Sequence, residues 1–94
     1  MTEEQLSHIE KLAGLFYTPR EIAIMLSLPL THFVAQCELE ESPVYQAYWR
    51  GYYEADMQYR EDVKRIAHLG SSPAQTLLGK IIETRKSTMH DMRD

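Results

Sequence analysis

Residues 18–28, which read TPREIAIMLSL, decide the fold of this chain. Thr18 is placed as a helix N-cap before a proline, and Glu21 stands three residues later as its capping-box partner. Ala23 supplies a small residue where a second helix can cross closely, with apolar neighbours on both sides. Because Pro29 forces the preceding residue into an extended conformation, the segment predicts a short helix that ends before a tight turn.

A helix is expected on each side of this segment. Upstream, an N-cap at Thr2 with Gln5 as its capping-box partner opens a helix whose apolar residues recur at helical spacing. Downstream, a helix over about residues 30–39 carries Phe33 as an apolar anchor. Two helices joined by a tight turn, with an anchor on the second, are typical of a helix-turn-helix motif. Ser27 stands where that motif usually has glycine, which predicts a strained turn.

Two longer helices are expected in the second half of the chain. Ser42-Pro43 repeats the helix start of an N-cap followed by proline. Between Pro43 and Gly70, Gly51 is the one residue that disfavours a helix. This length predicts a helix of about 26 residues, roughly 40 Å long. Gly70 is suited to cap that helix, and Pro73 restarts the chain as a fifth helix. A loop this short between long helices predicts an antiparallel hairpin.

The sequence therefore predicts an all-α chain, with an N-terminal three-helix helix-turn-helix bundle followed by a long antiparallel helical hairpin. We place the helix-turn-helix unit at residues 1–41, the hairpin at residues 42–90 as the assembly element, and a frayed tail at residues 91–94. A chain of 94 residues buries a modest core, and domains of this size often gain stability by oligomerisation.

Composition argues against membrane, secreted and enzymatic classes. No apolar run approaches the roughly 18 residues of a membrane span, and the acidic N-terminus is unlike a signal peptide. The single Cys37 lies in an apolar run, where an inert buried thiol is expected, and together these features point to the cytoplasm. The four histidines show no metal-ligand spacing. We expect no enzyme activity, no catalytic residue, no metal site and no cofactor.

The second helix of the motif offers Thr31, His32 and Gln36 as side chains that can hydrogen-bond to bases or phosphates. With Arg20 at the start of the preceding helix, these are the candidate DNA-binding residues. The net charge of the chain is −4, and residues 1–42 hold two basic residues against seven acidic ones. Since phosphate neutralisation supplies most non-specific affinity, one copy is expected to bind DNA weakly, and an oligomer would gain by avidity.

A second apolar strip on the fourth helix points to self-association. Trp49, Tyr53 and Met57 stand at positions i, i+4 and i+8, on the face away from the main apolar stripe of that helix. A large apolar strip on a helix already buried on its other side is typical of a contact with a partner. These three residues are the candidate interface of a homo-oligomer.

The order of these motifs resembles the small terminase subunit family of tailed phages, which belongs to the DNA-packaging motor. The resemblance covers about residues 5–84 and implies a non-enzymatic, ring-forming protein of the host cytoplasm. Such a protein recognises double-stranded viral DNA and hands it to the large terminase ATPase subunit. The resembling segments are Leu12-Ala13, residues 18–23 with Leu26 and Phe33, residues 47–51, and residues 66–74 with Leu77-Leu78.

Two alternatives remain open. One is a dimeric helix-turn-helix transcription regulator, in which the long helix makes a two-fold interface. The other is an acidic protein-interaction module, for instance an inhibitor of a host factor. The low net charge and the acidic segment at residues 38–41 favour the module over the regulator. The expected hairpin and its turn favour the packaging adaptor over both.

Overall fold

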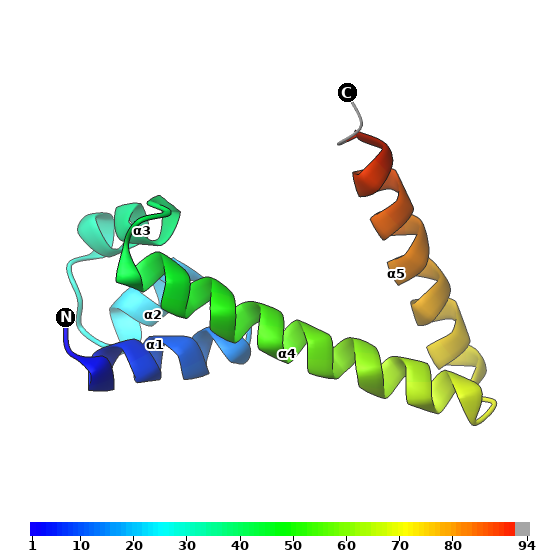
Figure 1. Ribbon diagram of the computed structural model, residues 1–94. Coiled ribbons are helices and arrows are strands. Elements are labelled where there is room, and N and C mark those ends of the chain that lie inside the picture. The colour runs from blue at the N-terminus through cyan, green and yellow to red at the C-terminus, as the bar shows by residue number, and fades with distance from the viewer. Residues whose placement is uncertain (92–94) are drawn as a thin grey trace. The chain divides into compact units, whose positions relative to one another are not determined.

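The computed structural model describes residues 1–91, and every regular element in that range is an α-helix (Figure 1). The predicted all-α class is therefore confirmed. None of the helices in this range is long and apolar enough to cross a membrane. The expected frayed tail lies, from residue 92 on, outside the described residues. The five helices are α1 (Glu3–Gly14), α2 (Pro19–Met25), α3 (Leu30–Glu38), α4 (Pro43–His68) and α5 (Ser72–Asp91).

The first two helices begin with the capping boxes that the sequence predicts. In α1 the backbone N–H of Gln5 donates to the Thr2 hydroxyl at 3.2 Å, and the Thr2 N–H donates to the Gln5 side chain at 2.9 Å. In α2 the Glu21 N–H donates to the Thr18 hydroxyl at 3.2 Å, and the Thr18 N–H donates to the Glu21 carboxylate at 2.9 Å. Each box satisfies backbone donors that a helix start leaves unpaired.

Three helices end in the same hydrogen-bonded turn, which places one residue in the left-handed conformation. At the end of α4 this residue is Gly70, with φ 99°, and the next N–H donates back to the carbonyl of Ile66 at 3.3 Å. Phe16 (φ 67°) and Ser27 (φ 55°) hold the same place after α1 and α2. Because a side chain makes this conformation costly, the strain expected at Ser27 is present.

The chain forms two compact units, Met1–Asp56 and Met57–Asp94, named unit 1 and unit 2 below. The division falls inside α4, whereas the expected domain boundary follows residue 41. The first half of α4 belongs to unit 1 because Val44, Ala47 and Tyr48 are buried in the same core as the first three helices.

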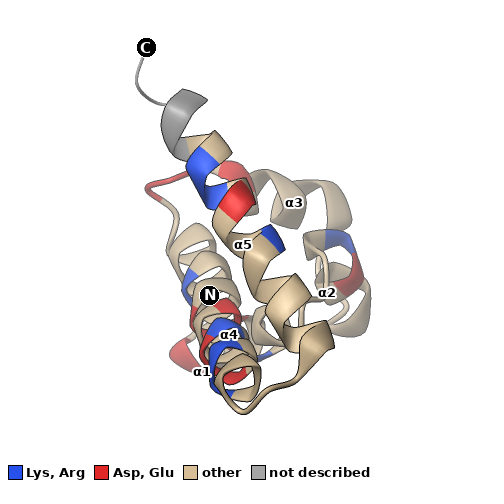
Figure 2. Ribbon diagram, turned by 90° about the vertical axis from the view of Figure 1, so that its right-hand side faces the viewer, with Lys and Arg blue, Asp and Glu red and all other residues tan. Residues whose placement is uncertain are grey.

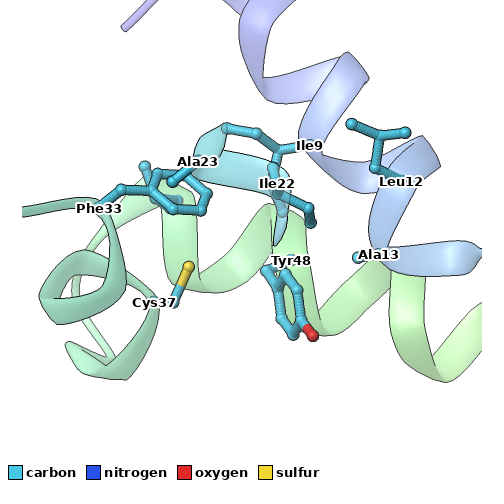
Figure 3. Packing of buried hydrophobic residues seen from close by; sticks show 10 residues of the cluster. Ile9, Leu12, Ala13, Ile22, Ala23, Phe33, Cys37 and Tyr48 are labelled. Atoms are coloured by element: carbon cyan, nitrogen blue, oxygen red, sulfur yellow. The ribbon is translucent and has the colours of Figure 1, made fainter. Parts of the chain in front are cut away.

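The core of unit 1 draws side chains from α1, α2, α3 and the first half of α4 (Figure 3). Phe33, Ile9 and Ile22 are its largest fully buried side chains, and Ala23 lies beside them with 1% of its surface exposed. Ala23 thus occupies the small-residue position predicted for it. The remaining buried members are Leu12, Ala13, Cys37, Val44, Ala47 and Tyr48.

Small residues allow α1 and α4 to approach closely within unit 1. A Cβ built on Gly14 would lie 3.3 Å from the carbonyl oxygen of Gly51 and 3.7 Å from the Cβ of Ala55. Beside this crossing, the Arg50 guanidinium lies 3.4 Å from the Glu10 carboxylate. The crossing therefore combines a backbone contact with an ion pair near the surface. Of these two interactions, the backbone contact contributes more to stability.

Unit 2 consists of the second half of α4, the turn around Gly70 and α5. Among the side chains that the structure describes in this unit, the buried core is small and consists of one valine, Val63, and two alanines, Ala67 and Ala74. Leu78 and Ile81 of α5 pack against this cluster and stay partly exposed. Within the described part of unit 2, little apolar surface is thus buried between the two helices.

Candidate nucleic-acid and assembly surfaces

Helix α3, the candidate DNA-reading helix, has one buried face and one exposed face. Phe33 and Cys37 point into the core of unit 1, whereas Thr31, Ala35 and Glu38 are exposed. The helix carries no lysine or arginine, and the segment that follows it is acidic (Figure 2). Its exposed face therefore offers the Thr31 hydroxyl, the His32 imidazole and the Glu38 carboxylate, and no lysine or arginine for a phosphate.

The structure separates the four candidate DNA-binding residues into two groups. Arg20, Thr31 and His32 are exposed, the first on α2 and the other two on α3. Gln36 is half-buried, and its Oε1 accepts a hydrogen bond from the Ser42 hydroxyl at 2.7 Å. Gln36 is thus bound to the connection between α3 and α4, while the other three side chains are accessible to a ligand.

Ser42 makes two hydrogen bonds, of which the sequence predicts one. Its hydroxyl accepts from the Val44 N–H at 3.1 Å, which is the helix-start role expected of a serine before a proline. The second bond of the same hydroxyl, to Gln36, joins α3 to the start of α4. This bond depends on the path of the intervening chain, and no local pattern predicts it.

A pocket of about 280 Å³ opens beside this link and is named the junction pocket here. Apolar side chains dominate its wall, with polar groups from His32, Gln36 and Ser42. All of its residues belong to unit 1. The lining residues are Met1 and Leu6 from the N-terminus and α1, Leu28 and Pro29 from the α2–α3 turn, His32, Phe33 and Gln36 from α3, and Ser42, Pro43 and Val44 at the start of α4.

The two units differ in charge. Unit 1 carries three basic residues against nine acidic ones, a net charge of −6 with histidine neutral. Unit 2 carries seven basic residues against five acidic ones, a net charge of +2. Long-range attraction of a polyanion therefore favours unit 2, although the candidate DNA-binding residues belong to unit 1.

The predicted interface residues also differ from one another in exposure. Trp49 is half-buried at the edge of the unit 1 core, where its indole N–H donates to the backbone carbonyl of Cys37 at 3.3 Å. Tyr53 and Met57 are 61% and 56% exposed. The indole thus helps to hold α3 against α4, and the apolar surface offered to a partner is that of Tyr53 and Met57.

Unit 2 exposes further large apolar side chains. Ile66 and Leu69 of the fourth helix and its turn are 40% and 78% exposed, and Leu77 and Ile82 of α5 are 41% and 46% exposed. Tyr59 is 46% exposed. These five side chains are called the unit 2 apolar face below, and the described residues of the unit bury three side chains, those of Val63, Ala67 and Ala74.

The single cysteine is buried, and the described residues contain no cluster of metal-binding side chains. Burial and the nearby Glu38 carboxylate raise the pKa of the Cys37 thiol from 9.0 to about 11, so the thiol stays protonated near neutral pH. Within residues that the structure describes, no three His, Cys, Asp or Glu side chains gather in a way that could hold a metal ion.

Comparison with known proteins identifies no relative. No family model, no curated protein and no solved structure matches this chain. Its function is therefore inferred from the surfaces described above.

Proposed function

We propose that this protein is a non-enzymatic DNA-packaging adaptor resembling a phage small terminase subunit. In this proposal α1 to α3 serve as a helix-turn-helix unit, and α4 with α5 serves as an antiparallel hairpin that joins copies into a homo-oligomer. The oligomer binds double-stranded DNA and presents it to a large ATPase subunit in the host cytoplasm. The observation that carries the proposal is the apolar surface that unit 2 leaves exposed.

The unit 2 apolar face supports assembly because the unit buries too little to stand alone. Two helices joined by one turn rely on packing for their stability, and here Val63, Ala67 and Ala74 supply the only fully buried contacts in the described part of the unit. Large exposed apolar surface on a protein often marks a contact with a partner. A second copy would cover Ile66 and Leu77 and supply the missing core.

Weak DNA contact by each copy suits an assembly of many copies. Arg20, Thr31 and His32 are exposed polar groups in unit 1, and they provide one permanent positive charge. One such charge gives little affinity, because each neutralised phosphate contributes a limited salt-dependent increment. When several linked copies bind one duplex, their contributions to the binding free energy add. The affinity for DNA is therefore expected to depend on assembly.

The assembly step is tested with Ile66→Glu combined with Leu77→Glu. Glutamates at these positions would place unpaired charges in the proposed interface, while both positions are partly exposed in a single copy. We expect the variant to keep its helical circular dichroism and to fall to a much lower native mass. Leu39→Glu is the matched control, since Leu39 is 48% exposed in unit 1. Equal native masses for all three proteins would refute the interface.

The DNA step is tested by fluorescence anisotropy with a labelled duplex over a range of salt concentrations. Arg20→Gln is expected to weaken binding and to reduce the salt slope by about 1 per copy engaged. Lys11→Gln, which removes a charge outside the candidate residues, is the control. An assembled wild type that shows no duplex binding even at low salt would refute the DNA role and leave the assembly proposal intact.

A further inference from the structure

We propose that the junction pocket is a second binding site, which takes one apolar anchor side chain from a positively charged segment of a partner protein. This inference concerns only unit 1 and goes beyond the proposed function, because it depends neither on assembly nor on DNA. It follows from the size of the pocket, its free hydrogen-bond donors and the charges beside it.

The size of the pocket suits one large side chain. Its volume is about 280 Å³, and a cavity of about 150 Å³ is enough to hold benzene. Small-molecule sites usually range from about 300 to 1,000 Å³, so this pocket is small for a cofactor and adequate for an indole or a leucine with part of its backbone. Buried anchors of this kind supply most of the affinity of many protein interfaces.

The polar groups of the pocket suit a peptide backbone. The Oε1 of Gln36 is occupied by the Ser42 hydroxyl, which leaves the two hydrogens of Nε2 for an acceptor. Gln36 lines the pocket together with the apolar side chains of Phe33 and Leu28. An apolar side chain in the pocket would therefore bring its own backbone carbonyl within reach of Gln36.

The charges beside the pocket favour a basic partner. Glu3 and Glu4 lie in the chain between the lining residues Met1 and Leu6, and both are exposed. Glu40 and Glu41 are also exposed and immediately precede Ser42. Lysine or arginine residues that flank an anchor would meet these carboxylates, which speeds association and selects against acidic partners.

The same charges disfavour nucleic acid at this position. Phosphates need cations, yet the pocket wall contains no lysine or arginine. Unit 1 as a whole has a net charge of −6. A protein segment therefore suits the pocket better than DNA does. Duplex DNA is included in the test below as the alternative ligand.

The test uses the full chain labelled with ¹⁵N and a synthetic peptide amide of one tryptophan between two pairs of lysines. We expect saturable shifts in the backbone amide signals of Leu28, His32 and Gln36 at sub-millimolar to millimolar peptide. The same peptide with alanine for tryptophan should bind at least about tenfold more weakly, because it lacks the anchor. The peptide with glutamates for the lysines should give no shifts. Equal binding of the first two peptides, or pocket shifts produced by duplex DNA instead, would overturn the proposal.

Variants of the protein separate the anchor from the charges. Leu28→Trp fills the pocket and is expected to reduce peptide affinity at least about tenfold, whereas Ile24→Trp, on an exposed position outside the pocket, should not change it. Glu40→Lys with Glu41→Lys should reduce affinity several-fold at low salt and less at high salt, compared with Glu54→Lys. The charge variants keep the test decisive if Leu28→Trp does not fold. Unchanged affinity in the charge variants at low salt would contradict the proposed site.

Discussion

The backbone of Gly51 in α4 rests directly on the carbonyl group of Glu10 in α1. A Cβ at position 51 would overlap the Glu10 carbonyl oxygen and lie 2.8 Å from its carbonyl carbon. These atoms belong to the main chain of another helix, so they cannot turn aside as a flexible side chain can. The contact sets the separation of the two helices and holds the first half of α4 in unit 1.

Gly51→Ala is expected to destabilise the protein by about 3 kcal/mol or more, because the added methyl group must push two helix backbones apart. The free energy of unfolding in urea measures this loss. Gly79→Ala is the matched control, since a Cβ at Gly79 meets no atom within 4 Å. That control should gain about 0.5 to 1 kcal/mol from a better helix former. Similar behaviour of the two variants would show that the close approach of the helices is incorrect.

Ser27→Gly is expected to stabilise unit 1 by up to about 1 kcal/mol. Ser27 has φ 55°, and glycine adopts this conformation without the steric cost that a Cβ brings. Part of the gain is offset by the greater freedom of glycine in the unfolded chain. Thermal or urea unfolding of the variant measures the balance. A clear loss of stability would mean that the turn after α2 is not left-handed.

The capping box of α2 should make Glu21 titrate at low pH. Hydrogen bonds from the backbone and the hydroxyl of Thr18 lower the pKa of the Glu21 carboxyl below its ordinary value of 4.5. Because the folded-state pKa is lowered, the stabilisation is present above pH 4.5 and is lost as the pH falls through the folded value. Side-chain carbonyl NMR should show this lowered pKa in the wild type and its return toward 4.5 in Thr18→Ala. A Glu21 pKa of 4.5 or higher in the wild type would contradict the box.

Cys37 should react with thiol reagents only when the protein opens. Its pKa is raised to about 11, and its side chain is 3% exposed, so thiolate is scarce and sheltered at pH 8. The rate of reaction with a chromogenic disulfide should be very low in buffer and should rise steeply through the urea unfolding transition. Rapid reaction of the native protein would place Cys37 on the surface.

The sequence predicts the local parts of this fold well. The capping boxes at Thr2 and Thr18, the left-handed turn at Gly70 and the helix starts at prolines depend on neighbours within five residues, and the structure contains all of them. Such signals are readable because hydrogen bonds between near neighbours do not depend on the path of the rest of the chain.

Contacts between distant residues explain what the sequence could not predict. Gln36 is polar and spaced like a DNA-reading residue, but its partner Ser42 lies across a chain reversal. Trp49 fits an exposed strip by periodicity, yet its indole bonds to the carbonyl of Cys37, twelve residues earlier. In both cases a tertiary contact occupies a polar group of the side chain, and that group is no longer available to bind DNA or a partner. The junction pocket is formed by four separate segments and has no local signal at all.

Light scattering after size-exclusion chromatography measures the native mass of the 94-residue chain and thereby decides whether its copies assemble. We expect one discrete assembly of more than about six copies, which persists at high salt because apolar side chains hold it together. A single-copy mass of 11.0 kDa at low and high salt would contradict it. A dimer would contradict the packaging ring as well, and would fit the two-fold interface of a transcription regulator.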